Sequence, residues 1–171
     1  MWLYIVGGLV VLLGFSAFFG APYVPSRRRD ITRMFDTLYL LSAKDVLIDV
    51  GSGDGIVLRE ASFRGATAVG YEINPVFVVI SKWLSRGNAK VVVTMANFWT
   101  ARFPDAATVI YAFSVERDGK KLINKIQSEA TRLNKQLVLI CYGSPLPGRA
   151  AVRNFEAYHL YEFHPLQVSA A

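Results

Sequence analysis

Short apolar segments alternate with helical segments from Val46 onward, and this alternation limits the possible fold more than any other feature of the sequence. Strands that are apolar along their whole length and are separated by helices are typical of a parallel sheet covered on both faces. We therefore predict an α/β fold with a doubly wound, mostly parallel sheet. The expected strands are 46–50, 67–72, 90–94, 108–113, 136–142 and 158–163, and the expected helices are 31–42, 56–63, 75–86 and 118–133.

The N-terminal segment differs from the rest of the chain, because residues 2–21 include no charged side chain. A helix of about 20 residues is about 30 Å long, which is the thickness of the hydrocarbon core of a bilayer. A secretory signal peptide is the alternative, but it begins with basic residues and ends with small residues at a cleavage site. Here no basic residue precedes Trp2, and Phe18 and Phe19 lie where cleavage would occur. We therefore predict one transmembrane helix at residues 2–21.

Basic residues follow the predicted anchor directly. Arg27, Arg28, Arg29 and Arg33 lie on this side, whereas the α-amino group is the one cation on the other side. The positive-inside bias then places the folded domain on the cytoplasmic side of the membrane, or on the matrix side in a mitochondrion. The formal net charge of +6 is compatible with nucleic-acid binding, but we favour a basic collar that faces anionic lipids. The sequence thus divides into an anchor (2–21), a linker with a helix (22–44) and a globular domain (45–171).

A glycine-rich loop follows the first predicted strand. It reads Asp49-Val50-Gly51-Ser52-Gly53-Asp54-Gly55, and a helix is expected directly after it. In a doubly wound sheet the ligand binds at the carboxyl ends of the strands, and glycines let it approach the backbone closely. The N–H groups at the start of the next helix are expected to face this ligand. Alone, the loop is also compatible with a simple tight turn.

Glu72, at the end of the second predicted strand, makes this loop a candidate nucleoside site. It lies about 20 residues beyond the first glycine, where a carboxylate accepts hydrogen bonds from the two hydroxyls of a ribose. Dinucleotide sites have the pattern G-x-G-x-x-G, whereas this loop has G-x-G-x-G and carries the carboxylates of Asp49 and Asp54. These carboxylates would repel a pyrophosphate and attract a cation. The sulfonium and ammonium groups of S-adenosylmethionine (AdoMet) meet this requirement.

Two motifs resemble those of the class I methyltransferases. The loop at 49–55 resembles their first motif, and Gly70-Tyr71-Glu72-Ile73-Asn74-Pro75 resembles their ribose-binding motif. The segment Pro22-Tyr23-Val24-Pro25-Ser26 lies directly after an apolar span. With this segment, the chain is similar to the small membrane-anchored lysine methyltransferases of mitochondria and to their bacterial relatives. The mitochondrial enzymes modify the ATP synthase c subunit and the adenine nucleotide translocase. The likeness covers residues 2 to about 142. It implies a seven-strand sheet, and the sequence leaves the seventh strand unassigned because a shortened segment follows Tyr142.

The resemblance also implies roles for individual residues. The Asp49 carboxylate and the loop backbone would hold the methionine part of AdoMet, and Glu72 would hold the ribose. The segment 96–99 matches the family's Asp-Leu-Trp, with Asn97 in place of Asp, and the Asn97 carbonyl would accept a hydrogen bond from adenine. Phe98 or Trp99 would stack on the adenine ring, although both are equally compatible with the core. The predicted cofactor site contains Asp49, Gly51, Ser52, Gly53, Asp54, Gly55, Glu72, Ile73, Asn97 and Phe98.

The sequence defines the acceptor site less closely. The segment 113–116, Phe-Ser-Val-Glu, is not an Asn-Pro-Pro-Tyr-type motif, which argues against methylation of adenine or of a glutamine amide. No catalytic acid or base is predicted, because methyl transfer from a sulfonium depends mainly on alignment. No metal site is predicted either, since the chain has one cysteine and two histidines without a ligand-like spacing. The residues expected to line the acceptor pocket are Tyr23, Val24, Pro25, Phe113 and Ser114.

Together these features predict an AdoMet-dependent methyltransferase that acts near a membrane, with a lysine of a membrane protein as the acceptor. Two alternatives stay open: methylation of a lipid, quinone or other small membrane molecule, and a non-catalytic AdoMet-binding domain. A dehydrogenase ranks last because the third glycine is misplaced for a dinucleotide. The sequence does not determine the acceptor, the number of methyl groups transferred or the oligomeric state.

Overall fold

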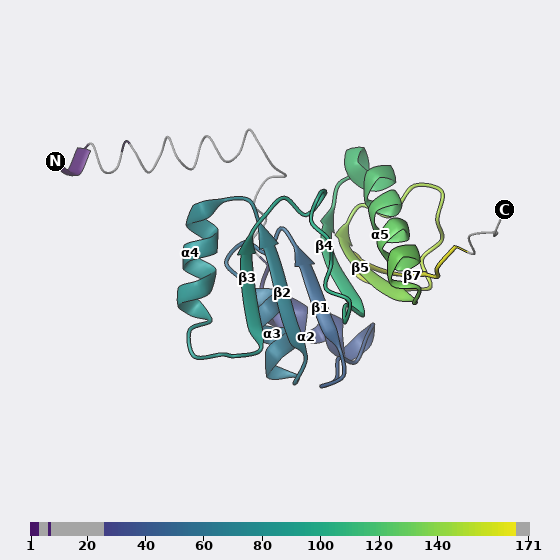
Figure 1. Ribbon diagram of the computed structural model, residues 1–171, viewed down its shortest axis with the longest axis horizontal. Helices are drawn as coiled ribbons and strands as arrows, with labels where there is room; N and C mark the ends of the chain where they lie inside the picture. Colours follow the sequence, from purple (N-terminus) through teal and green to yellow (C-terminus); the bar gives the residue numbers. More distant parts are fainter. Residues whose placement is uncertain (4–6, 8–25, 167–171) are drawn as a thin grey trace.

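The computed structural model describes residues 1–3, 7 and 26–166, and its centre is a seven-strand sheet (Figure 1). The strands are β1 (Val46–Val50), β2 (Thr67–Glu72), β3 (Val91–Met95), β4 (Val109–Ser114), β5 (Leu137–Gly143), β6 (Arg153–Phe155) and β7 (Tyr158–Phe163). Between residues 26 and 166 the helices are α2 (Arg28–Thr37), α3 (Ile56–Phe63), α4 (Pro75–Leu84), α5 (Gly119–Leu133) and the short 3-10 helix η1 (Glu116–Asp118). The predicted α/β fold is confirmed.

The order of the strands places the glycine loop at the usual ligand position of such a sheet. The order is β3-β2-β1-β4-β5-β7-β6. Strands β1 to β5 pair in parallel, and β7 is antiparallel to both β5 and β6. The chain therefore reverses its direction of winding between β1 and β4. In open α/β sheets ligands bind at this switch point, outside the carboxyl ends of the strands.

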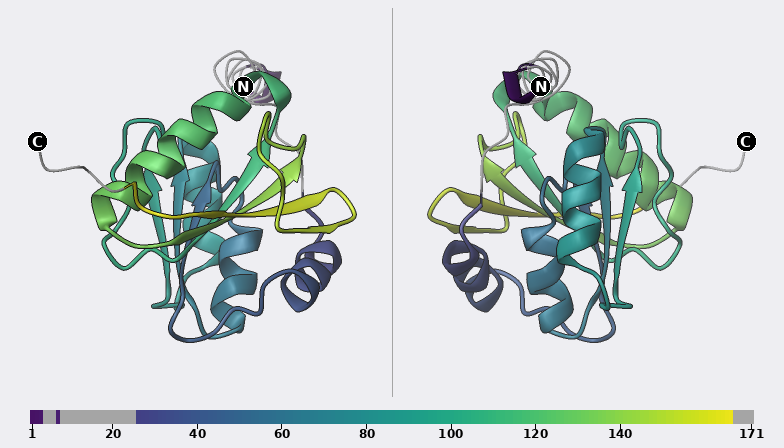
Figure 2. Two further views of the ribbon diagram at one scale, coloured as in Figure 1. Left: turned by 90° about the vertical axis from the view of Figure 1, so that its right-hand side faces the viewer. Right: turned by 90° about the vertical axis from the view of Figure 1, so that its left-hand side faces the viewer.

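Helices cover both faces of the sheet, which explains why its strands are apolar throughout (Figure 2). On one face, Met34 of α2, Leu58 of α3 and Val78 of α4 belong to a common core. On the other face, Leu122 and Ile126 of α5 pack into a second core. The glycine loop is thus held between two well-packed layers.

Helix α2 is displaced from its prediction of 31–42. It runs from Arg28 to Thr37, because the segment that follows is organised by a side chain instead of by helical hydrogen bonds. The carboxylate of Asp45 accepts hydrogen bonds from the Ser42 N–H and the Ser42 hydroxyl, both at 2.9 Å, and from the Tyr39 hydroxyl at 3.0 Å. Such side-chain bonds to a nearby backbone compete with helix formation and end the helix early.

Strand β6 was missed by the sequence prediction. It has three residues, Arg153–Phe155, and pairs antiparallel with β7 at the edge of the sheet. Its side chains are exposed or half-buried, so no apolar pattern marks it. With β6 the sheet reaches the seven strands that the resemblance implies.

Among the described residues, no helix combines the length and the apolar character needed to cross a membrane. The anchor predicted at residues 2–21 falls mainly on positions outside the described set. Tyr23, Val24 and Pro25 of the predicted acceptor pocket also lie outside it. The described chain resumes at Ser26, two residues before α2 begins at Arg28.

Candidate functional site

The glycine loop between β1 and α3 is tied to β2 and leaves one side of its backbone open. The N–H groups of Gly51 and Ser52 both donate to the Tyr71 carbonyl, at 2.8 and 3.1 Å. Gly51 has a φ of 85°, and a Cβ added to it would meet no atom within 4 Å. The Gly51 backbone therefore borders open space at the carboxyl edge of the sheet, where a ligand can approach it closely.

Glu72 organises this loop as well as facing the predicted ligand position. One carboxylate oxygen accepts a hydrogen bond from the Gly53 N–H and the other from the Asn74 N–H, both at 2.8 Å. A carboxylate oxygen has two acceptor positions, so each oxygen retains one for the hydroxyl of a ligand. Sequence reasoning predicted the ligand role and missed the structural one.

Asp49 is a buried carboxylate at the end of β1, and it is 3% exposed. In the sheet it lies opposite Gly70 of β2 and Tyr111 of β4. Burial raises the pKa of the Asp49 carboxyl well above its ordinary value, and the negative charges of Glu72 and Asp54 raise it further. A cationic group bound beside Asp49 would offset this cost and restore the carboxylate.

Asp54 is oriented toward α3. Its Oδ1 accepts a hydrogen bond from the Ile56 N–H at 3.1 Å, and its Oδ2 lies 3.6 Å from Nη2 of Arg59. The first N–H group of α3 therefore binds a side chain of the same chain. A phosphate at this helix start would have to displace the Asp54 carboxylate.

Two other glycines are required by packing. A Cβ on Gly55, which has a φ of 78°, would lie 2.1 Å from the Ser81 Oγ of α4. A Cβ on Gly70 would lie 2.6 Å from both the Ser52 Oγ and the Leu58 Cδ1. The backbone at Gly55 thus lies against α4 and the backbone at Gly70 against the loop and α3, so neither position has room for a side chain.

The segment predicted to hold adenine lies beside Glu72. The Ala96 N–H donates to the Glu72 carbonyl at 3.0 Å, and the Asn97 Oδ1 accepts from the Trp99 N–H at 3.1 Å. The Asn97 oxygen thus keeps one of its two acceptor positions. Ile73, the next residue after Glu72, is 53% exposed and provides an apolar surface at the same edge.

The two aromatic rings of this segment are not equivalent. The ring centroids of Phe98 and Trp99 are 4.2 Å apart, and both rings pack against the core on the α5 face. The Nζ of Lys121 lies 4.2 Å from the centroid of Trp99. Trp99 thus already has a cation on its ring, whereas none of the described cationic side chains lies over the ring of Phe98.

A group of tyrosines beyond Asp49 was not predicted. Tyr111 lies beside Ser26 and Tyr158, and the ring centroids of Tyr142 and Tyr158 are 4.8 Å apart. Burial raises the pKa of Tyr111, with Tyr158 and Asp49 adding to the shift. The alternation of side chains along β4 was the available signal, because Tyr111 lies two residues before Phe113 and therefore on the same face.

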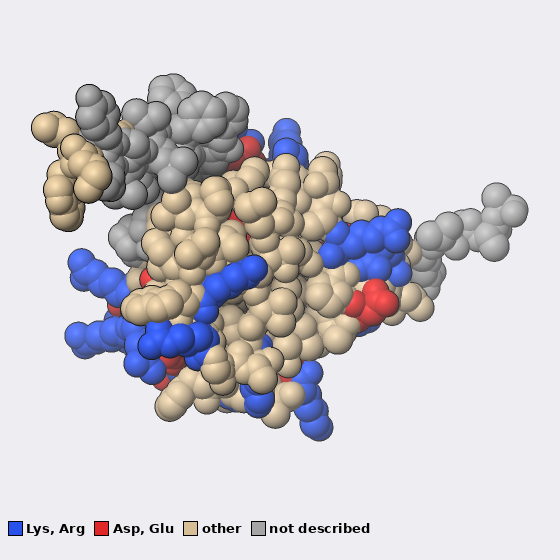
Figure 3. Space-filling model, turned by 60° about the vertical axis from the view of Figure 1, so that its left-hand side comes forward, with Lys and Arg blue, Asp and Glu red and all other residues tan. Residues whose placement is uncertain are grey.

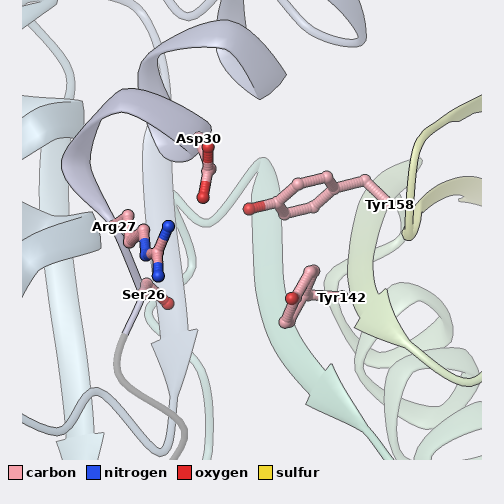
Figure 4. A pocket seen from close by; sticks show the side chains of 5 residues that line it. All are labelled: Ser26, Arg27, Asp30, Tyr142 and Tyr158. Carbon is pink, nitrogen blue, oxygen red and sulfur yellow. The ribbon is translucent and has the colours of Figure 1, made fainter.

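A cavity of about 310 Å³ lies next to these tyrosines (Figure 4). In Figure 4 the Asp30 carboxylate at the start of α2 and the Tyr158 hydroxyl from β7 point toward the same space. Burial raises the pKa of Tyr158 to about 12, and the nearby Tyr142 and Asp30 contribute to the shift. Of the predicted acceptor residues, Phe113 joins this group, with its ring centroid 6.0 Å from that of Tyr142. The cavity is lined by Ser26, Arg27, Asp30, Tyr142 and Tyr158.

Solved structures with this architecture include several methyltransferases. An RNA methyltransferase from Salinibacter ruber, in complex with S-adenosyl-L-homocysteine, matches with a TM-score of 0.72 and 23% identity, over 86% of this chain and 98% of that one. The protein has the class I methyltransferase fold. The 23S rRNA methyltransferase ErmE matches with a TM-score of 0.55 and 18% identity, over 70% of this chain and 48% of that one. At these sequence identities, the structural similarity shows a shared fold and does not identify the acceptor.

Curated sequences give a second comparison, while no protein-family model matches the chain. The human lysine N-methyltransferase of the ATP synthase c subunit is 31% identical over 113 residues, which cover 63% of this chain and 46% of that protein. The rat protein of the same name is 30% identical over 113 residues, covering 63% and 50%. This chain thus spans about half the length of the curated relatives it matches. The predicted resemblance to the lysine methyltransferases of the ATP synthase c subunit is confirmed.

The buried Asp49 should make the stability of this methyltransferase fold depend on pH. Because its native pKa is above the unfolded value of about 3.9, the native state binds more protons, and stability falls as the pH rises from about 4 through the native pKa. We expect Asp49→Asn to remove this decline and to melt at a higher temperature than wild type at pH 7. Thermal unfolding of the full chain in detergent at several pH values measures the effect. The control is Asp105→Asn, a carboxylate with 90% exposure, which should keep the wild-type decline.

Proposed function

We propose that this chain is an AdoMet-dependent methyltransferase that acts beside a membrane on a lysine of a membrane protein. The observation that carries the proposal is the buried Asp49 next to Glu72, in a glycine loop whose helix start is capped by Asp54. A site with these carboxylates, one of which binds the first N–H group of the helix, disfavours a pyrophosphate. It suits a nucleoside that carries positive charge.

The residues of the loop divide the binding of AdoMet between them. AdoMet supplies a methyl group on a positively charged sulfur. Glu72 accepts hydrogen bonds from the ribose hydroxyls, and Asp49 stabilises the positive charge of the methionine part. Ile73 and Phe98 contact the adenine ring, and the free acceptor position of Asn97 receives the adenine amino group. Gly51 allows the ligand to contact the backbone.

The acceptor enters through the cavity beside α2. Its tyrosine rings pack against the aliphatic part of a lysine side chain, and the Asp30 carboxylate attracts the amine. Arg27 lines the same cavity, and its positive charge offsets the rise in amine pKa that the Asp30 carboxylate causes. The amine attacks the methyl group in its neutral form, after it has lost a proton. Tyr111 lies opposite Asp49 in the sheet and beside Tyr158, so it lies between the cofactor loop and the cavity.

Two further observations support the acceptor and its location. The curated relatives are named for methylation of a lysine of the ATP synthase c subunit, which favours a lysine in a membrane protein. The uncharged segment 2–21 and the arginines after it favour a single span, with the domain on the cytoplasmic or matrix side.

Transfer of a labelled methyl group tests the proposed function. Membranes are incubated with the full chain and methyl-labelled AdoMet, and we expect label on a lysine of a membrane protein. The matched control is Glu72→Gln, which keeps the size of the side chain and should transfer much less label. Label found in the lipid extract and absent from protein would assign the activity to small membrane molecules. AdoMet binding without transfer to any membrane fraction would make the domain non-catalytic.

A further inference from the structure

Helix α4 buries the large apolar side chain of Val78 and exposes four others. The face that it turns inward also includes Ser81, and Ser85, directly after the helix, is buried as well. Surface helices of globular domains generally turn apolar residues inward and polar residues outward. The outward side chains, which we call the α4 apolar face, are Val79 (66% exposed), Ile80 (37%), Trp83 (61%) and Leu84 (41%).

The α4 apolar face is one continuous surface. Val79 and Trp83 are four residues apart, as are Ile80 and Leu84, so both pairs lie on the same side of the helix. Figure 3 brings the α4 side of the molecule forward and shows uncharged surface next to several Lys and Arg side chains. Exposed apolar surface of this kind marks a contact with a partner or a membrane.

The charged side chains of the segment that contains this face are all positive. No Asp or Glu occurs between Glu72 and Asp105, whereas Lys82, Arg86, Lys90 and Arg102 lie in that interval. The Cζ of Arg86 lies 4.8 Å from the ring centroid of Trp83, so a cation adjoins the aromatic part of the face. The surface is therefore complementary to a partner that is apolar and negatively charged.

We propose that the α4 apolar face docks on the surface of an anionic lipid bilayer. Its aliphatic side chains and Trp83 enter the boundary between headgroups and acyl chains, while Lys82 and Arg86 contact lipid phosphates. Tryptophan favours this boundary because its ring is apolar and its N–H is polar. The docking rests on the proposed function because both place the domain beside a membrane. It does not depend on AdoMet binding.

A second copy of this chain fits the α4 apolar face less well than an anionic bilayer does. Two α4 helices packed side by side and parallel about a two-fold axis would bring Lys82 and Arg86 of one copy against those of the other. No carboxylate between residues 73 and 104 is available to neutralise them. Like charges at such an interface are unfavourable, whereas anionic lipids neutralise every one of them.

Fluorescence quenching by lipid tests the docking. Val79→Cys in the full chain carries an environment-sensitive fluorophore, and Cys141, the one native cysteine, is buried and poorly reactive. The protein is placed in vesicles of phosphatidylcholine and phosphatidylglycerol that contain a lipid-borne quencher. The matched control is Val152→Cys, also exposed, which precedes β6 at the opposite edge of the sheet from β3. We expect roughly threefold stronger quenching at position 79 than at position 152.

The outcomes separate the occupants of the face. Equal quenching at the two positions would overturn the proposal, and so would a label at position 79 that responds to a second labelled copy and not to lipid. A second variant, Trp83→Glu in the Val79→Cys background, should reduce the quenching and leave the melting temperature unchanged. AdoMet affinity, measured on the same samples by calorimetry, reports separately on the proposed function. Loss of AdoMet binding with intact quenching would contradict that function alone.

Discussion

Glu72→Ala is expected to lower the affinity for AdoMet by about 100-fold or more. The substitution removes the acceptors for two ribose hydroxyls, and hydrogen bonds to a charged group contribute about 1.5–3 kcal/mol each. It also removes the carboxylate that accepts hydrogen bonds from the Gly53 and Asn74 N–H groups, so the loop keeps only its backbone hydrogen bonds to the Tyr71 carbonyl of β2. Calorimetry of the full chain in detergent, titrated with AdoMet, measures the loss.

The control for this prediction is the stability of the unliganded protein. Glu72→Gln should keep most of the melting temperature, because the amide retains the shape of the side chain and one acceptor oxygen. Its AdoMet affinity should lie between those of the wild type and Glu72→Ala. If Glu72→Ala binds AdoMet as tightly as the wild type, or if folding and binding are lost together, the assignment of Glu72 to the ribose is wrong.

Gly55→Ala is expected to destabilise the fold by about 2–4 kcal/mol, without any loss of a polar contact. A left-handed conformation costs a residue with a Cβ about 1–2 kcal/mol, and Gly55 has a φ of 78°. The new Cβ would also lie 2.1 Å from the Ser81 Oγ, so α4 must shift or Ser81 must change its rotamer. Denaturant unfolding of the full chain in detergent reports the difference.

Gly51→Ala is the matched variant for this effect. Gly51 also has a positive φ, of 85°, but a Cβ there meets no atom within 4 Å, so we expect a loss of about 1–2 kcal/mol. Its AdoMet affinity should fall sharply, because the added methyl group occupies space on the ligand side of the loop. Adding Ser81→Ala should restore part of the stability of Gly55→Ala and none of the affinity of Gly51→Ala. Equal stability of the two glycine variants would contradict the packing of α3 against α4.

The elements predicted with correct bounds are those whose apolar residues are buried in a core. Strands β1, β2 and β7 and helix α3 have the predicted bounds, because each is apolar where it enters a core and is ended by a turn. Strand β6 is held at an edge by pairing with β7, which leaves no pattern in three residues. The early end of α2 depends on Asp45, whose bonds to Ser42 and Tyr39 form only when the chain has turned back.

In the candidate site, too, residues that lie close in the sequence were predicted, and residues that are brought together by the pairing of distant strands were not. Glu72 and the glycine loop were found because their spacing is encoded within one strand-helix-strand unit. The contact of Tyr111 with Asp49 comes from the register of β1 on β4, and the contact of Tyr142 with Tyr158 from that of β5 on β7. Spacing along the chain does not specify such registers, so the tyrosine cavity appeared only in the structure.

Helix α2 contacts β6 and the turn after it, which are synthesised much later than the helix itself. Arg33 of α2 lies 2.9 Å from Glu156, between β6 and β7, and Arg153 of β6 donates to the Leu38 carbonyl. On the ribosome α2 emerges before β6 and β7 exist, so these two contacts form only after strands β1 to β5 have been synthesised. The tyrosine cavity has walls from both α2 and β7 and is therefore completed only after β7 has been synthesised. The glycine loop between β1 and α3 can thus fold before the walls of this cavity come together.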